Sequence, residues 1–147
     1  EFGRWTPYSV EGEEVWEFNN QGAESYYATI SGYPNENEDW LISPAYNLDK
    51  YKNERLSFMN ASNYGGPMLE VKISSNYSGS GDPTEAVWSD LSGFMLSEGD
   101  FAWVYSGEID LSTYVGSNVY IAFVYKSESN SGRIWEVDDI TIIGDTK

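Results

Sequence analysis

The stretch IWEVDDITII, residues 134–143, combines the strongest apolar alternation in the chain with two adjacent acidic residues. Trp135 and Val137 share one face of a strand, whereas the two isoleucines after the acidic pair share a face of opposite parity, so the period of two must shift. The shift falls on Asp138 and Asp139. An extra residue there, a β-bulge, restores the register, and bulges are frequent beside functional sites. We therefore predict a bulged strand with a carboxylate at the bulge.

Further segments show the alternation of short strands, without a long amphipathic helix or an internal repeat. The clearest is MLEVKIS, residues 68–74. VYIAFVY, residues 119–125, is apolar on both parities and is expected in the centre of a sheet, with both faces covered or with one face lining a groove. Residues 32–39 are rich in turn-forming and acidic types and are predicted to form a loop. The pattern predicts an all-β fold, a two-sheet β-sandwich of the jelly-roll type, rather than a lipocalin-like barrel, whose up-and-down strands need shorter loops.

The length fits one domain with a single core. We expect residues 3–147 to form one β-sandwich module, and we interpret Glu1 and Phe2 as a cloning scar.

The charge and the missing residue types exclude several function classes. The 147 residues include 24 acids and 8 bases, a net charge of −16, so the domain repels nucleic acid and anionic membranes. No apolar run approaches the roughly 18 residues needed to span a bilayer. Histidine and cysteine are absent, which excludes a Ser-His-Asp triad, a cysteine nucleophile, a thiolate zinc site and a disulfide. We expect a binding domain rather than an enzyme.

Six sequence blocks in a fixed order resemble the choice-of-anchor J and cleaved-adhesin type domains of secreted Bacteroidetes-type proteins. These blocks are NEDWLISPAYNL (37–48), LSF (56–58), LEVKISSNYSG (69–79), SGEIDLSTY (106–114), VYIAFVY (119–125) and WEVDDITI (135–142). The resemblance covers nearly the whole chain. It implies a jelly-roll sandwich that serves as an accessory module beside an enzyme or adhesin, often with a structural calcium ion.

Calcium also suits the residues themselves, because this ion takes six to eight oxygen ligands from carboxylates, amides and carbonyls. Adjacent carboxylates in an apolar strand are costly unless a partner neutralises them. The predicted ligands come from the bulge and from the predicted loop: Asp138, Asp139, Glu38 and Asp39. The alternative is that the two acids at the bulge cap turns or pair with Arg55 or Arg133.

The aromatic content of 16% suggests a sugar site, because flat rings contact the apolar face of a pyranose while nearby acids and amides accept hydrogen bonds from its hydroxyls. The candidate residues lie on an alternating segment, on the central strand and in loops: Trp103, Tyr105, Tyr120, Tyr64 and Tyr77. The alternative is that these rings belong to the core. The two loop tyrosines are expected to be exposed.

These observations support two hypotheses. The first is a non-catalytic, calcium-stabilised carbohydrate-binding module that targets an attached secreted enzyme to a polysaccharide. The second is a protein-binding or architectural adhesin-type domain. In both, we expect a monomer within a larger multidomain protein, secreted or at the cell surface, without nucleic acid or membrane partners.

Overall fold

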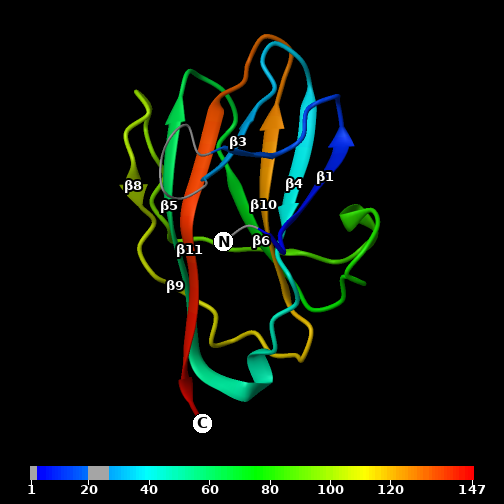
Figure 1. The fold of residues 1–147 in the computed structure, drawn as a ribbon, viewed down its shortest axis with the longest axis vertical. Helices are drawn as coiled ribbons and strands as arrows, with labels where there is room; N and C mark the ends of the chain where they lie inside the picture. Colours follow the sequence, from blue (N-terminus) through cyan, green and yellow to red (C-terminus); the bar gives the residue numbers. More distant parts are fainter. Residues whose placement is uncertain (1–2, 20–26) are drawn as a thin grey trace.

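The computed structural model describes residues 3–19 and 27–147 and shows two antiparallel sheets that face each other (Figure 1). The five-stranded sheet contains, in spatial order, β1 (Thr6–Glu11), β4 (Asn37–Ile42), β10 (Tyr120–Ser127), β6 (Glu70–Ser74) and β7 (Ser89–Asp90). The six-stranded sheet contains β2 (Glu17–Asn19), β3 (Tyr27–Ser31), β11 (Ile134–Thr146), β5 (Tyr51–Asn63) and β8 (Val104–Tyr105), with β9 (Ile109–Asp110) also paired to β5. Within the described ranges the helical turns are η1 (Leu48–Lys50) and η2 (Pro83–Glu85), both 3₁₀. The predicted two-sheet sandwich is confirmed.

The strands β5 and β11, of 13 residues each, pair along their full length and are the two longest strands of the six-stranded sheet. The register of β11 shifts between Asp138 and Thr141, and Asp139 adopts a φ of +49°. The Asp138 carboxylate accepts a hydrogen bond of 2.8 Å from the Asp139 amide. The predicted β-bulge at the acidic pair is therefore confirmed. A second shift lies between Ile143 and Asp145.

The main hydrophobic core fills the space between the sheets, and its largest buried side chains include Trp16, Phe58, Phe123 and Trp135. The rings of Phe58 and Phe123, from opposite sheets, meet edge to face with centroids 4.9 Å apart. Residues 121–125 of β10 are all buried, so the prediction of a central strand covered on both faces is confirmed.

A second hydrophobic cluster lies on the outer face of the five-stranded sheet, where residues 75–88 cover it. Trp88 of this connection packs against Trp40 of β4, with ring centroids 5.0 Å apart. Tyr77 of the same connection packs against Tyr120 of β10, with centroids 5.1 Å apart. The chain thus uses its own aromatic residues to cover both faces of this sheet.

The prediction of a loop over residues 32–39 is wrong for its last three residues, which begin β4. Asn37 and Asp39 are buried. The Asn37 amide can be buried because it donates hydrogen bonds to the Gly32 carbonyl at 3.1 Å and to the Ser127 hydroxyl at 3.1 Å. The polar residues at the start of β4 can therefore form a strand, because the Asn37 side chain is hydrogen-bonded to residues of the neighbouring turns.

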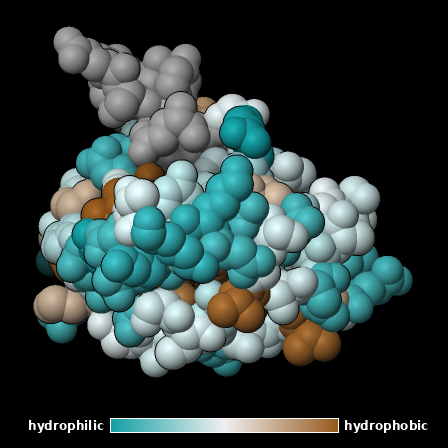
Figure 2. Space-filling model, turned by 90° about the horizontal axis from the view of Figure 1, so that it is seen from below, coloured by the Kyte–Doolittle hydropathy of each residue, from teal (hydrophilic) through white to brown (hydrophobic). Residues whose placement is uncertain are grey.

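The surface at the end seen from below is mostly hydrophilic, with isolated hydrophobic residues (Figure 2). Helices long and apolar enough to cross a membrane are absent from the part of the chain that the structure describes.

The bulge predicts an unequal response to two substitutions on β11. Asp139→Val places a β-branched residue at a positive φ and is expected to lower the free energy of unfolding by about 1–2 kcal/mol. Thr141→Val, at an exposed position two residues further, should change it by less than about 0.5 kcal/mol. Urea denaturation measures both. Equal effects would contradict the assigned conformation of Asp139.

Candidate functional site

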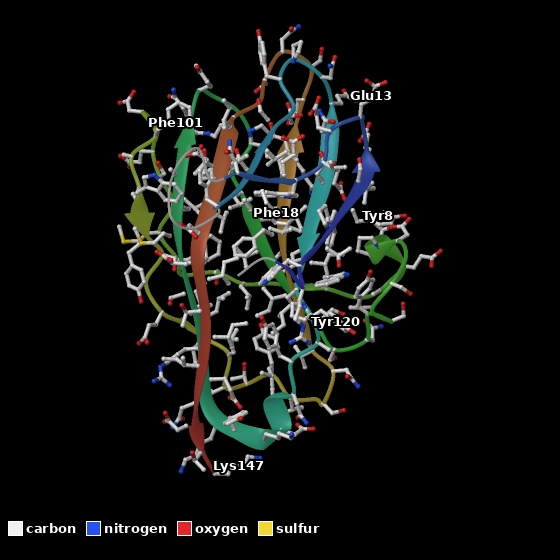
Figure 3. The ribbon with its side chains drawn as sticks, in the orientation of Figure 1. Tyr8, Glu13, Phe18, Phe101, Tyr120 and Lys147 are labelled. Atoms are coloured by element: carbon white, nitrogen blue, oxygen red, sulfur yellow. The ribbon has the colours of Figure 1, made fainter. Side chains whose placement is uncertain are left out.

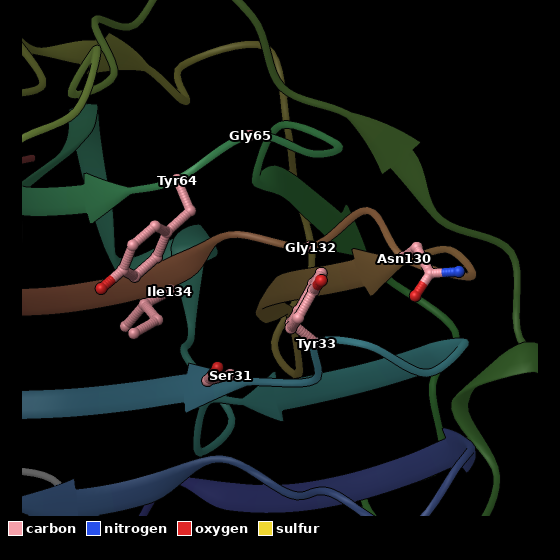
Figure 4. A pocket seen from close by; sticks show the side chains of 7 residues that line it. All are labelled: Ser31, Tyr33, Tyr64, Gly65, Asn130, Gly132 and Ile134. Carbon is pink, nitrogen blue, oxygen red and sulfur yellow. The ribbon is translucent and has the colours of Figure 1, made fainter.

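A cavity of about 570 Å³ opens at one end of the six-stranded sheet. Figure 4 shows Tyr64 and Ile134 at one end of this cavity and Tyr33 and Asn130 at the other. Tyr33 and Tyr64 are 60% and 63% exposed, so both rings present surface to a ligand. Asn130 adds an amide. Apolar rings beside a few polar groups are the usual composition of a ligand site.

A second cavity, of about 330 Å³, shares Ser31 and Ile134 with the first. We call the two together the sheet-end groove. The second part contains Tyr27, Phe101 and Glu136, together with further polar and acidic residues of β2 and β3 and the segment before them: Glu14, Glu17, Asn19 and Thr29. No lysine or arginine of residues 3–19 and 27–147 lines either part.

Buried hydrogen bonds hold the loops of the groove in place. The hydroxyl of Tyr125, a fully buried residue of β10, accepts a hydrogen bond of 2.9 Å from the Gly32 amide and donates one of 2.7 Å to the Arg133 carbonyl. One phenol thus joins the loop that carries Tyr33 to the hairpin that carries Asn130.

The loop that carries Tyr64 is fixed to the same hairpin. A Cβ atom at Gly66 would lie 2.7 Å from the Gly132 Cα, so the backbones meet at a distance that only glycine allows. The Arg133 side chain donates to the Gly66 carbonyl at 3.2 Å.

Three residues of the groove have an unusual backbone conformation. Tyr64, Phe101 and Asn130 adopt φ values of +71°, +53° and +57°, which non-glycine residues rarely adopt. The Tyr64 and Phe101 rings meet nearly at right angles, with centroids 6.3 Å apart. Such conformations cost free energy and concentrate at binding sites, where the surrounding structure enforces them.

Carboxylates give the groove its electrostatic character. Burial raises the pKa of Glu136, which lies on β11 between the two neighbouring strands. Burial, and next the negative charge of Glu136, raise the pKa of Tyr27 beside it. A ligand that donates hydrogen bonds to Glu136 would compensate for this lost solvation, whereas an anionic ligand would be repelled.

The structure separates the five aromatic residues that the sequence suggested for sugar binding. Tyr64 lines the groove, and Trp103 is exposed beside it, in edge contact with Tyr27 at 6.1 Å. Tyr105 is exposed on the edge strand β8 and does not line the groove. Tyr77 is only 9% exposed, so the expectation that it is exposed is wrong.

Tyr120, with Tyr77, belongs to the covered cluster on the other sheet. Figure 3 shows Tyr120 and Tyr8 on the side of the five-stranded sheet, away from Phe101. The alternative interpretation, that these rings serve packing, therefore holds for Tyr77 and Tyr120. The local sequence around Tyr77 and Tyr120 does not indicate that residues 75–88 cover this face of the sheet.

The four acids predicted as calcium ligands do not form one cluster. Asp138 and Asp139 lie on β11 of the six-stranded sheet, whereas Glu38 and Asp39 lie on β4 of the other. Within residues 3–19 and 27–147, no group of three or more acidic side chains is placed to hold a metal ion. Asp138 caps the bulge, and Glu38 accepts a hydrogen bond of 2.9 Å from the Trp40 indole.

Asp39 differs from the other three acids because it is 0% exposed and neither of its carboxylate oxygens has a hydrogen-bond partner. Burial, with added repulsion from the carboxylates of Glu14 and Glu38, raises its pKa to about 7. The Ser9 hydroxyl lowers the pKa in part but directs its hydrogen bonds to the backbone carbonyls of Glu11 and Gly12. An ionised Asp39 therefore needs a positive partner.

Sequence reasoning missed most of the groove, including the four residues Tyr33, Asn130, Ile134 and Glu136. Two of them had a detectable signal, because Tyr33 lies between a glycine and a proline and Asn130 lies in a short hairpin loop. The other two belong to the stretch 134–143, where the alternation of apolar residues does not indicate which positions line a cavity.

Comparison with solved structures shows similar sandwiches. A cleaved adhesin domain of Lys-gingipain from Porphyromonas gingivalis has a TM-score of 0.64 at 16% identity, over 97% of this chain and 92% of that chain. A family 11 carbohydrate-binding module from Clostridium thermocellum, in complex with a β-1,3-1,4-mixed-linked tetrasaccharide, has a TM-score of 0.59 at 16% identity, over 99% and 91%. TmCBM61, in complex with β-1,4-galactotriose, has a TM-score of 0.57 at 15% identity, over 99% and 91%.

These likenesses show the fold, and they confirm the predicted jelly-roll sandwich of the cleaved-adhesin and carbohydrate-binding type. The resemblance to choice-of-anchor J domains stays a prediction. No curated protein sequence matches the chain. A family profile described as "Domain of unknown function (DUF5017)" matches residues 16–145. Since this match spans well over half of the chain, the protein belongs to the DUF5017 family.

Proposed function

We propose that this domain is a non-catalytic carbohydrate-binding module that holds a polysaccharide chain in the sheet-end groove. The observation that carries the proposal is the groove itself, in which exposed rings lie beside amide and carboxylate acceptors on loops that hydrogen bonds hold in place. Tyr33, Tyr64 and Phe101 would contact the apolar faces of sugar rings. The Asn130 amide would donate hydrogen bonds to sugar hydroxyls or accept them, and the Glu136 carboxylate would accept them.

The charge of the groove supports a neutral glycan. Among the residues that the structure describes, three carboxylates and no basic side chains line it, in a domain whose net charge is −16. Uronic acids and sulfated sugars would therefore meet repulsion both at long range and at contact. Within a longer secreted protein, such a module would hold an attached enzyme close to its polysaccharide, which raises the local substrate concentration.

A second candidate function is that of a protein-binding or architectural adhesin-type domain. The likeness to an adhesin domain of Lys-gingipain supports it as strongly as the other likenesses support sugar binding. The polar acceptors inside the groove favour the carbohydrate hypothesis, because an architectural role does not need them.

We also propose that calcium stabilises the fold, with Asp39 as its principal ligand. Two unpartnered oxygens in one buried carboxylate suit a hard cation, and Ser9, Glu14 and Glu38, which all influence the pKa of Asp39, offer further oxygen donors. Backbone carbonyls and water would complete the coordination. The bulge acids Asp138 and Asp139 lie on the other sheet and are left out of this proposal.

Affinity electrophoresis on a panel of neutral polysaccharides tests the sugar site. Retardation by at least one glycan is expected, and Tyr64→Ala should weaken it about fivefold to tenfold, since one stacking ring contributes about 1–1.5 kcal/mol. Tyr105→Ala is the matched control, because Tyr105 is exposed outside the groove and its loss should leave retardation unchanged. Retardation by no glycan, together with binding to a partner protein, would favour the adhesin-type function instead.

Thermal unfolding at two pH values tests the calcium site. The folded pKa of Asp39, about 7, exceeds its ordinary value of 3.8, so folding takes up a proton between these values. Without calcium, the stability contributed by this group therefore falls as pH rises from about 4 to 7. Calcium should replace the proton and raise the melting temperature at pH 8 more than at pH 5.

Two variants separate the candidate ligands. Asp39→Asn should abolish both the pH-dependent loss and the calcium response, whereas Asp138→Asn should retain them. A melting temperature that a chelator leaves unchanged at pH 8 would disprove the calcium proposal.

A further inference from the structure

A second buried acidic residue lies at the opposite end of the sandwich from the sheet-end groove. Glu54 of β5 is 5% exposed, and with Asp39 it is one of the two buried acidic residues of the described ranges. It continues the row of core-facing residues that includes Leu56 and Phe58. In the described part of the chain, neither a hydrogen bond nor an ion pair reaches its carboxylate, although five ion pairs join other charged side chains, and its oxygens are open to solvent rather than fully buried.

Glu54 lines a cavity of about 370 Å³ where the start of β5, the end of β11 and the segment around η1 meet. This end carries the C-terminus in Figure 1 and is mostly hydrophilic in Figure 2. We call the cavity the Glu54 pocket. Tyr46, Leu48, Tyr51 and Ile142 supply its apolar surface.

The backbone of β11 is adapted to this carboxylate. The register of the strand shifts around Gly144, and a Cβ there would lie 3.2 Å from Glu54 Cγ and 2.9 Å from Tyr51 Cβ. Glycine therefore leaves the space through which the glutamate side chain passes. A bulge beside a pocket that contains an unpaired charge is typical of a binding site.

We infer that the Glu54 pocket binds a primary ammonium group carried on an aliphatic chain. A carboxylate without a partner inside a pocket attracts a cation, and only one carboxylate lines this pocket among the described residues, which is too few for calcium. The apolar walls suit the alkyl chain, and the tyrosine rings favour an adjacent cation. The net charge of −16 concentrates cations around the domain.

The one cation of the pocket itself does not neutralise Glu54. Lys50 lines the rim and is exposed, and it forms no ion pair with Glu54 in the described structure. A ligand can therefore reach Glu54 without displacing an ion pair of Lys50. This inference is independent of sugar binding, because the two sites share no lining residue.

Titration of the isotope-labelled full chain with n-butylammonium chloride, followed by amide NMR shifts, tests the inference. Saturable shifts at Ile142 and Gly144 are expected, with a Kd on the order of 1–10 mM for so small a ligand. n-Butanol, which has the same alkyl chain without the charge, should bind at least tenfold more weakly. Equal binding of the two compounds would overturn the inference.

Glu54→Gln keeps the shape of the side chain and removes its charge, and it should weaken butylammonium binding at least tenfold. Its fold should be retained, because Glu54 forms no ion pair among the described residues that the substitution would break. Glu128→Gln, an exposed acid at the other end of the molecule, controls for the change in net charge and should bind as the wild type does. Undiminished binding to Glu54→Gln, or no saturable shift in the wild type, would refute the assignment.

Discussion

The pairing of β5 with β11 is the constraint on which the rest of the structure depends. Both strands run the full length of the six-stranded sheet, so their ends define both ends of the sandwich. At one end, Tyr64 follows β5 and Ile134 begins β11, and together they line the sheet-end groove. At the other end, Glu54 and Gly144 meet in the Glu54 pocket. One long ladder thus positions two separate candidate sites.

Two buried carboxylates are hard to explain by stability alone. Most acids of this domain are exposed or paired, whereas Asp39 and Glu54 are buried and lack partners among the described residues. Replacing Asp39 by an apolar residue would remove a cost on the order of several kcal/mol, because both of its carboxylate oxygens are buried without a partner. Their retention is consistent with ligands that supply the missing charge, a hard cation for Asp39 and an ammonium group for Glu54.

The sequence predicted the fold better than the site, for physical reasons. Periodicity is a local property, so the central strand and the bulge at Asp139 could be derived from alternation alone. A site depends on contacts between distant segments. The sequence around Tyr77 does not indicate that residues 75–88 fold onto the outer face of the five-stranded sheet. The sequence around Asp39 does not indicate that this acidic residue is buried. The absence of histidine and cysteine was more informative, because it removed whole classes of chemistry.

The high aromatic content has two separate origins. One set of rings, around Trp40 and Trp88, seals the outer face of the five-stranded sheet, and the other set surrounds the groove of the six-stranded sheet. The central claim is that a glycan binds the second set. Amide NMR shifts induced by a neutral oligosaccharide test it most directly. The account predicts the largest shifts at Ser31, Asn130 and Ile134, and the largest shifts around Trp40 and Trp88 would contradict it.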